Sequence, residues 1–568
     1  MTSLILPETE SFLAGENAKT LGAFYTDTQI ADFLVWWAVR SARDTVMDPS
    51  FGGGVFLRSA CKRLLKLGGH PPNQVFGVEI DPNTHAQISE KLLDEFGLKK
   101  HHLVLANFFD LDDLPVRRVD AMIGNPPFIR YQRFSGDTRK LALQCAAKQG
   151  VQLTELSSSW APFLVHSIAM VKQGGRTAMV VPMEIVHATY ALPVLEHLSR
   201  AFGTVTFLTF KKKLFPDLNE NTLLLLAEDK GASSSRFLWR DLAHAGSLAE
   251  IQYRGQYSRL GARHINGQGV AQGKERLIEY FIPKKTRELY HELKSLPLTC
   301  RLGGLADVGI GYVTGSNDFF HLDLEETRIW GIPQAYLKPT IRRSRALTGL
   351  RFTKIDWRKA LEMGEASYLL SIESETDLPK NVRKYIEYGE AQGIPKAYKC
   401  RTRSPWFRVP HVYQPDAFLT YMSGATPRLV ANDARVCASN SLHILRLRPQ
   451  IPLTSSAIAA LWQTSLTHLS AEIEGHALGG GLLKLEPTEA ENVVVAANQA
   501  SRRQLEELAE ELDTLARNGD RATVQSRADT AILKENLGLS QSDCYLLRTA
   551  AEALRQRRYF RGGQYEPA

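Results

Sequence analysis

Asn125-Pro126-Pro127-Phe128 is the segment of this sequence whose residue types are best suited to chemistry. It follows an apolar run, and the two consecutive prolines stiffen the backbone directly after that run. The Asn125 side-chain oxygen and the Pro126 carbonyl oxygen would be two fixed acceptors, one for each hydrogen of an amine. An exocyclic amine such as N6 of adenine is a poor nucleophile, because its lone pair is delocalised into the ring. Paired acceptors would localise that lone pair and aim it at an electrophilic methyl group.

Phe128 adds an aromatic ring to the same segment. A base stacked on an aromatic side chain gains about 1–3 kcal/mol. The segment therefore predicts a site that holds a nucleobase and acts on its amine. The alternative is an ordinary turn between a strand and a loop.

A glycine-rich segment, Asp48-Pro49-Ser-Phe-Gly52-Gly-Gly54, separates an expected strand from an expected helix. Glycines let a backbone approach a ligand closely, and the amino end of a helix favours negative or polar groups. In open α/β sheets such turns lie beyond the strand ends, where ligands bind. The spacing differs from G-x-G-x-x-G, so it does not indicate a dinucleotide site. A tight turn with packing glycines is the alternative interpretation.

The next expected strand ends in acidic residues, in the run Val75-Phe-Gly-Val-Glu79-Ile-Asp81-Pro. In nucleoside-binding α/β folds an acid at the tip of the second strand accepts hydrogen bonds from ribose hydroxyls. The spacing after the glycine turn favours that role for Glu79. Asp81 is better suited to capping the helix that follows it. Capping alone is the structural alternative for either acid.

These motifs need strands and helices that bring them together. Apolar runs typical of strands occur at residues 45–47, 75–78, 103–105, 121–123, 177–181, 205–210 and 222–226. Helical patterns lie between most of them, which indicates an open α/β sheet. The last two runs have no helix between them, so we expect an antiparallel hairpin at one edge of the sheet. The polar stretch 229–236 predicts the end of the α/β pattern.

The charge of the chain is unevenly distributed. Residues 1–250 carry 26 Lys+Arg and 26 Asp+Glu, and the other residues carry 43 and 35, so the net charge of +8 lies in the second part. A neutral part joined to a basic part indicates catalysis in one and polyanion binding in the other. Solvated lysine surfaces are the alternative. At 568 residues, two or three domains are expected.

The remaining composition narrows the class of protein. No apolar run approaches the roughly 20 residues that cross a bilayer, and the N-terminus has no basic segment typical of a signal peptide. The 6 cysteines are scattered, without a C-x-x-C pair. This pattern argues against a disulfide framework or a structural zinc site and fits a reducing cytosol. We expect a cytoplasmic protein that needs no metal.

Gly22-Ala-Phe-Tyr-Thr26, D-P-S-F-G-G-G, V-E-I-D and N-P-P-F occur in this order. In this respect the chain resembles the gamma-class, TaqI-like N6-adenine DNA methyltransferases of restriction-modification systems. The resemblance is clear over about residues 20–228 and looser beyond. It implies a Rossmann-like methyltransferase domain with a mixed sheet at 1–240 and a mixed α+β target-recognition domain at 241–500. A helical C-terminal segment is expected at 501–568, where the run QLEELAEELDTLAR has helical spacing.

The resemblance also implies S-adenosylmethionine as the methyl donor and assigns residues to it. Thr26 would flank its methionine part, although Thr26-Asp-Thr-Gln29 also reads as a helix capping box. Asp48, Pro49 and Gly52 would form the contacting turn, and Glu79 would bind the ribose.

The family usually has Asp followed by Phe where this chain has Asn107-Phe108. That acid accepts a hydrogen bond from the adenine amine of the donor, and the Phe packs on its ring. Asn107 can still accept, but without charge assistance. Phe128 stands where Tyr is more frequent, and Phe215 matches a second aromatic on the opposite face of the target base. A buried core position is the alternative for Phe215.

Methylation of a paired adenine requires the base to leave the duplex, at a cost of a few kcal/mol. The basic second part would supply phosphate contacts and read the sequence. Gly309-Ile-Gly-Tyr-Val-Thr-Gly315-Ser-Asn-Asp-Phe319 and Leu478-Gly-Gly-Gly-Leu482 resemble features of the family's recognition domain. The candidate DNA-contacting groups are a first cluster with Arg342, Arg343 and Arg345, and a second with Lys399, Arg401 and Arg403 near Trp406. The second cluster would share one face of a strand. Solvated surface is the alternative for both.

The expected function is thus site-specific methylation of adenine N6 in duplex DNA by a monomer, with a separately encoded restriction endonuclease as a candidate partner. Methylation of RNA or of a protein glutamine is one alternative, disfavoured by the large basic C-terminal part. A silent DNA-binding module is another, disfavoured by the intact motif. Cytosine N4 methylation usually goes with Ser in place of Asn125. Pro216-Asp217 and Glu228-Asp-Lys230 resemble a nuclease signature, which we disfavour because Glu228 follows a strand of the expected sheet.

Overall fold

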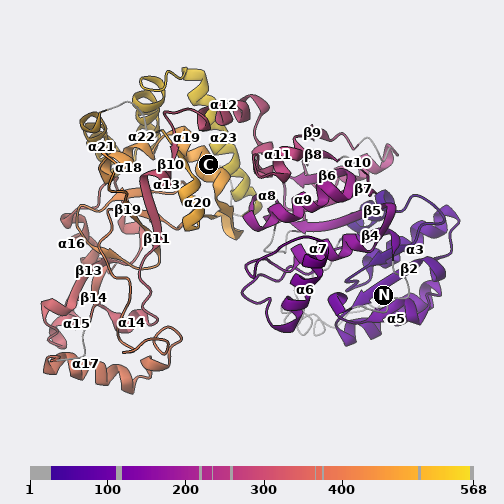
Figure 1. Ribbon diagram of the computed structural model, residues 1–568, viewed down its shortest axis with the longest axis horizontal. Helices are drawn as coiled ribbons and strands as arrows, with labels where there is room; N and C mark the ends of the chain where they lie inside the picture. Colours follow the sequence, from indigo (N-terminus) through magenta and orange to yellow (C-terminus); the bar gives the residue numbers. More distant parts are fainter. Residues whose placement is uncertain are drawn as a thin grey trace, which may run out of the picture. The chain divides into compact units, whose positions relative to one another are not determined.

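The computed structural model describes residues 27–110, 118–215, 221–232, 235–255, 260–364, 366–373, 377–496 and 501–562. The chain divides into two compact units (Figure 1). The first comprises the described residues up to Phe281 and from Tyr559 on, and the second spans Ile282–Arg558. Among the described residues, no helix is both long and apolar enough to cross a membrane.

A mixed sheet of 9 strands, in the order β3-β2-β1-β4-β5-β7-β6-β8-β9, forms the centre of the first unit. Its strands are β1 (Val46–Asp48), β2 (Val75–Glu79), β3 (Leu103–Leu105), β4 (Val119–Gly124), β5 (Val171–Pro182), β6 (Phe202–Phe210), β7 (Thr222–Lys230), β8 (Arg236–Leu242) and β9 (Arg263–Ile265). Strands β3, β2, β1, β4 and β5 are parallel, and β7 is antiparallel to both β5 and β6. The predicted α/β fold class is confirmed, and each predicted strand has a counterpart.

The far side of the sheet differs from the prediction. Strands β6 and β7 do pair antiparallel, but β8 pairs parallel with β6 and β9 pairs with β8, so the hairpin is not at the sheet edge. Strand β7 ends at Lys230 and β8 begins at Arg236, so the sheet continues beyond the polar stretch that was predicted to end the α/β pattern. β8 joins because its apolar residues Phe237 and Trp239 are buried in the core of the unit. The first unit consequently continues past the domain boundary expected at 240.

Helices accompany the strands of the first unit. They are α2 (Thr28–Ala38), α3 (Val55–Leu67), α4 (Pro71–Gln74), α5 (Pro82–Phe96), α6 (Gly136–Lys148), α7 (Trp160–Ala169), α8 (Glu184–His187), α9 (Leu192–Ala201), α10 (Ser247–Tyr253) and α11 (Gly267–Ala271). Asp81 caps α5, because its side chain accepts a hydrogen bond from Thr84 N at 2.7 Å, as predicted. Helix α2 is capped by Asp27, whose side chain accepts from Gln29 N at 2.7 Å, and Thr26, at which a capping box was predicted, lies outside the described residues.

The second unit is mixed α and β, as predicted. Its strands are β10 (Cys300–Arg301), β11 (Ala306–Ile310), β12 (His321–Leu322), β13 (Leu337–Ile341), β14 (Ala366–Leu370), β15 (Ala417–Thr420), β16 (Met422–Ser423), β17 (Leu429–Ala431), β18 (Cys437–Ala438), β19 (Leu442–Leu447), β20 (His476–Ala477), β21 (Leu483–Lys484) and β22 (Val494–Val495). They form sheets of 2, 4, 4 and 3 strands.

Helices make up the rest of this unit and the C-terminal region. They are α12 (Lys284–Lys294), α13 (Leu302–Leu305), α14 (Asn317–Phe320), α15 (Leu324–Ile329), α16 (Lys354–Glu362), α17 (Lys380–Ala391), α18 (Ser455–Leu461), α19 (Ser465–Glu474), α20 (Pro487–Asn492), α21 (Arg502–Arg517), α22 (Arg521–Ala528) and α23 (Gln541–Gly562). The helical segment expected after residue 501 is present. Helices α21 and α22 belong to the second compact unit.

Candidate active site

The site lies where the strand order of the sheet reverses, between β1 and β4. These two parallel strands pair through Val46↔Ala121 and Met47↔Met122, so their carboxyl ends meet at one edge. In open α/β sheets this reversal opens a crevice for ligands. Asp48 ends β1, and Asn125 follows the last residue of β4. The sheet thereby brings together two motifs that are far apart in the sequence.

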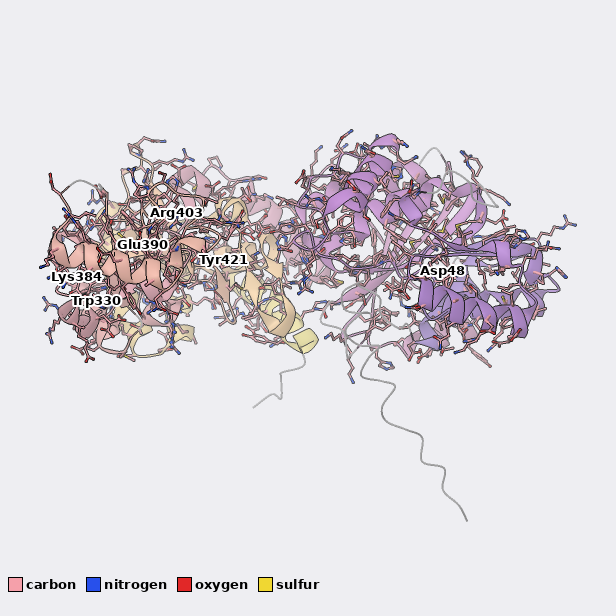
Figure 2. All side chains as sticks on the ribbon, turned by 90° about the horizontal axis from the view of Figure 1, so that it is seen from below. Asp48, Trp330, Lys384, Glu390, Arg403 and Tyr421 are labelled. Atoms are coloured by element: carbon pink, nitrogen blue, oxygen red, sulfur yellow. The ribbon has the colours of Figure 1, made fainter. Side chains whose placement is uncertain are left out.

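Asp48 is fully buried at this edge (Figure 2). One carboxyl oxygen, Oδ1, accepts a hydrogen bond from Ser50 N at 3.0 Å, and Oδ2 is buried without a partner among the described residues. Burial, with a smaller contribution from the charge of Glu79, raises the pKa of Asp48 from 3.8 to about 8. A buried carboxyl with an unused oxygen suits a cationic or hydrogen-donating ligand.

Gly124 permits the close approach of the two motifs. Its φ of +154° lies in a region that L side chains rarely adopt, and a Cβ there would lie 2.9 Å from Asp48 Oδ1. Any larger residue would therefore push Asp48 away from the segment that begins at Asn125.

Glu79 connects the glycine turn with the end of β2. Its Oε2 accepts from Gly52 N at 2.8 Å, and its Oε1 accepts from Ile80 N and Asp81 N, both at 2.9 Å. Ionised carboxylates have about four lone-pair sites, so these bonds leave acceptor capacity for a ligand. Pro49 lies in the same turn as Gly52, and both residues were predicted to contact the ligand.

Two exposed apolar side chains lie beside Glu79 and were missed in the sequence. Ile80 is 51% exposed and Leu105 is 49% exposed, and Leu105 is the register partner of Glu79 on β3. Exposed aliphatic groups at a ligand-binding edge would suit the face of a flat ring. In the sequence, the apolar residue Ile80 directly after Glu79 was the signal that could have indicated this apolar surface.

Asn107 and Phe108 follow β3 at the same edge. The Asn107 side-chain oxygen accepts from Phe109 N at 3.2 Å. Phe108 is buried, with its ring centroid 4.8 Å from those of Phe163 and His166. Burial lowers the pKa of His166, so this small cluster is uncharged at neutral pH.

Ser159 fixes the segment that contains Asn125. Its backbone N donates to Ile129 O at 3.0 Å, and its hydroxyl accepts from Ile129 N at 2.8 Å. The same hydroxyl donates to Pro127 O. Ser159 is 1% exposed and precedes α7. The sequence reading missed it, although three serines before a helix are a helix-start signal.

Phe128 borders a small, open hollow at this edge. The lining residues are Phe128, Arg130, Ser158, Trp160, Pro182 and Glu184. Because β4 and β5 are paired and parallel, the segments that follow both strands reach the same edge. Trp160 and Glu184 were also missed in the sequence, since nothing local links them to Phe128.

The other predicted residues of the first unit are placed differently. Phe215 is 7% exposed and belongs to the hydrophobic core of the unit, and it does not line this hollow. Its role as a second stacking aromatic stays a prediction. Thr26 and the rest of the Gly22–Thr26 motif lie outside the described residues.

Glu228 of the nuclease-like pattern pairs with Arg40 at 2.8 Å, and Lys230 donates to Ile168 O at 2.5 Å. Both contacts are part of the packing of the sheet. Pro216 and Asp217 lie outside the described residues.

The cluster predicted at Lys399, Arg401 and Arg403 is not on a strand. The backbone turns there, with Arg401 N bonded to Ala397 O and Arg403 N bonded to Cys400 O. These residues therefore do not share a strand face, as they would on a strand, because short-range hydrogen bonds close this segment into turns.

These basic side chains have different surroundings. Arg403, labelled in Figure 2, donates to Thr314 O at 2.7 Å and to Val313 O at 2.5 Å, so it clamps the Gly309–Phe319 segment. Lys399 and Arg401 are exposed, and their charged groups lie 5.3 and 5.4 Å from the ring centroid of Tyr398.

The remaining basic cluster follows β13. Arg342 is half-buried, and its carbonyl oxygen accepts from the hydroxyls of Ser439 and Ser441. Arg343 is exposed and has an interaction partner of its own. The structure thus keeps Arg342 and Arg343 adjacent at a strand end.

The fold is that of a Rossmann-like methyltransferase domain, and Asp48 and Asn125 lie at the carboxyl ends of its paired strands β1 and β4. Residues 10–192 match the family described as N-6 DNA Methylase, and residues 274–533 match the family described as Type II methyltransferase M.Eco57I, C-terminal domain. The N-terminal part of the chain is thus similar to the N-6 DNA methylases, and the chain is an adenine-specific DNA methyltransferase.

Relatives of similar length carry the same activity in their names. The Type II methyltransferase M.AccI of Acinetobacter calcoaceticus is 22% identical over 484 residues, which is 84% of this chain and 85% of the relative. The Type II methyltransferase M.XamI of Xanthomonas campestris pv. amaranthicola is 20% identical over 500 residues, covering 84% and 86%. The Type IIL restriction-modification enzyme MmeI, solved in complex with DNA, shares the fold with a TM-score of 0.55 at 13% identity, covering 93% of this chain and 75% of that one.

Proposed function

We propose that this chain is the modification enzyme of a restriction-modification system. It transfers a methyl group from S-adenosylmethionine to N6 of an adenine that has been flipped out of a specific duplex sequence. The observation that carries the proposal is the meeting of Asp48 and Asn125 at the sheet edge where the strand order reverses.

The residues at this edge fit S-adenosylmethionine. Asp48 offers a buried oxygen without a partner, Glu79 offers spare acceptor capacity, and Ile80 and Leu105 expose apolar surface beside it. We propose that Asp48 and Glu79 bind its polar parts, while Ile80 and Leu105 contact its ring. When bound, S-adenosylmethionine supplies a methyl group on a positively charged sulfur, which makes the methyl carbon electrophilic.

Pro49, Gly52, Asn107 and Phe108 follow the carboxyl ends of the same strands, and Thr26 is proposed from the family resemblance alone. Asn107 accepts without charge assistance, so we expect a weaker bond to the adenine amine of the donor than an Asp would give.

The chain's own residues orient the target amine. Asn125 and Pro126 offer two carbonyl oxygens for the two N6 hydrogens, and Phe128 offers a ring on which the base stacks. The Ser159 hydroxyl keeps this segment rigid, because it accepts from Ile129 N and donates to Pro127 O. A preorganised acceptor pair lowers the barrier because it needs no rearrangement during the reaction. Pro127 contributes by stiffening the backbone.

Base flipping follows from the buried position of N6 in a duplex. We propose that the second unit provides the binding energy through phosphate contacts. Lys399 and Arg401 flank the exposed ring of Tyr398, which is 65% exposed, and such a group can contact phosphates and stack on a base. Arg342 and Arg343 are a second candidate group, whereas Arg403 is engaged in clamping a loop.

Sequencing of methylated bases in DNA from cells that express the chain tests this proposal. Adenine N6 methylation at one recurring sequence is expected, and methylation confined to RNA or protein would overturn it. A monomer in the cytoplasm, with a separately encoded endonuclease as its partner, remains our prediction for the cellular setting.

A further inference from the structure

Glu184 is the only carboxylate among the residues that line the hollow beside Phe128. It begins α8 directly after β5, and β5 is the parallel neighbour of the strand that leads into Asn125. A base stacked on Phe128 at the mouth of this hollow therefore has a carboxylate in its surroundings. Nothing in the mechanism above uses this group.

The structure holds the Glu184 side chain in one orientation. Its Oε2 accepts a hydrogen bond from Trp160 Nε1 at 3.0 Å and another from the hydroxyl of Tyr190. Trp160 Nε1 also lies 2.9 Å from the Tyr190 oxygen. Burial, together with the charge of Glu184, raises the pKa of Tyr190, so its hydroxyl remains a donor at neutral pH. None of the bonds described here uses Oε1, the second oxygen of the carboxylate.

Methylation of an amine leaves one proton to be removed. The N6 lone pair forms the new bond to carbon, and the carbon–sulfur bond of the donor breaks with its electron pair left on sulfur. N6 then has two hydrogens, a methyl group and a positive charge. One N–H bond must break, with its electrons returning to nitrogen and the proton passing to a base.

The neighbouring acceptors are poor bases. Asn125 and Pro126 offer amide oxygens, which accept hydrogen bonds but do not retain a proton at neutral pH. Asp48, which the proposed function assigns to the methyl donor, is not among the described residues that line the hollow. Glu184 is an ionisable group at the wall of the same hollow.

We propose that Glu184 is a catalytic residue that stabilises the positive charge developing on N6 and accepts the proton from it. The inference rests on the proposed function. The bonds from Trp160 and Tyr190 keep one oxygen of the carboxylate occupied, which leaves the other for the amine. The proton then passes from Glu184 to solvent after the product base leaves.

Single-turnover methylation by Glu184→Gln tests the proposal. Gln retains the shape of Glu and an oxygen for Trp160 and Tyr190, but it carries no charge and takes up no proton. The rate is expected to fall roughly 100-fold, as for the loss of a general base. Glu196→Gln is the matched control, because Glu196 is exposed on α9 and pairs only with Arg200 of its own helix among the described ion pairs. Its rate should equal that of the wild type.

A second readout separates chemistry from structure. Duplex DNA with 2-aminopurine in place of the target adenine becomes more fluorescent when that base leaves the stack. Glu184→Gln should bind this DNA and raise its fluorescence as the wild type does. Loss of binding or of the fluorescence rise would mean that Glu184 only supports the pocket, and an unchanged methylation rate would equally overturn the proposal.

Glu184→Asp provides a further comparison, because it keeps a carboxylate on a shorter side chain. Its rate is expected to exceed that of Glu184→Gln, and the reverse order would contradict proton transfer. A wild-type protein that methylates no adenine in DNA would refute the proposed function itself. An active wild type with an equally active Glu184→Gln refutes only this inference.

Discussion

Replacement of Asp48 by Asn should make the ligand-free protein more stable and its methyl-donor binding weaker. Asp48 is fully buried, and its pKa rises from 3.8 to about 8 because the charged form is desolvated. Between these two values the folded protein holds a proton that the unfolded chain releases. Stability therefore falls as pH rises from about 4 to about 8, and it levels off above that range.

The size of the effect follows from the shift. Each pKa unit corresponds to about 1.4 kcal/mol, so the full shift amounts to roughly 6 kcal/mol of lost stability above pH 8. Asn is neutral in both states and avoids this loss. One carboxyl oxygen of Asp48 has no partner among the described residues, and the proton of neutral Asp48 would lie on it. In Asp48→Asn the amide NH₂ takes the same place. Neutral Asp48 and Asn should therefore give similarly stable proteins. Asp48→Asn should thus match the wild type near pH 4 and exceed it by a few kcal/mol at pH 8.

Denaturant unfolding of both proteins from pH 4 to pH 8.5 measures this difference. Asp120→Asn is the control. Despite its partial burial, hydrogen bonds from Lys172 and Thr45 lower the pKa of Asp120, so its replacement should reduce stability above pH 4. Calorimetric titration with S-adenosylmethionine at pH 8 should show about 10- to 100-fold weaker binding to Asp48→Asn, as for a lost hydrogen bond to a charged group. Equal stability of wild type and Asp48→Asn at pH 8 would refute the argument from burial, and unchanged binding would refute the assigned role.

Asn125→Ala should abolish methyl transfer in a single-turnover assay while cofactor and DNA binding remain, and unimpaired turnover would exclude the proposed mechanism. Ser159→Ala should lower the transfer rate and cost about 1–3 kcal/mol in unfolding experiments, because Ile129 N and Pro127 O lose their partner; a variant with normal rate and stability would contradict its positioning role. The double substitution Lys399→Ala and Arg401→Ala should weaken DNA binding and reduce the salt slope of log K by about 2, measured by fluorescence anisotropy from low to moderate salt. An unchanged slope would remove these residues from the DNA surface.

Much of the first unit is determined by local sequence. Apolar runs bounded by Gly, Pro and charged residues predicted its strands. This succeeded because the length of a strand and its alternation with helices depend on residues that are close in the sequence. The helix cap at Asp81 is equally local. The order of Asp48, Glu79 and Asn125, each at the end of an apolar run, sufficed to predict a ligand site at the carboxyl edge of a sheet. The structure places all three there.

The second unit was less readable. Arg403 looked like part of a basic surface, yet it donates both ends of its guanidinium to the carbonyls of Val313 and Thr314. Those residues are about 90 positions away in the sequence. The sequence shows which side chains are basic. Only the packing of the turns decides which of them form hydrogen bonds within the protein, as Arg403 does, and which stay exposed, as Lys399 and Arg401 do.

The sequence by itself was enough to propose the chemistry of Asn125-Pro126-Pro127-Phe128, because a side-chain amide and a backbone stiffened by two prolines follow from the residues alone. The tertiary structure decided what surrounds that motif. Parallel pairing of β4 with β5 brings Glu184 to the hollow beside Phe128, and the start of α7 brings Ser159 to the backbone of the motif. These contacts depend on strand order, which the pairing of distant segments sets and no local pattern encodes.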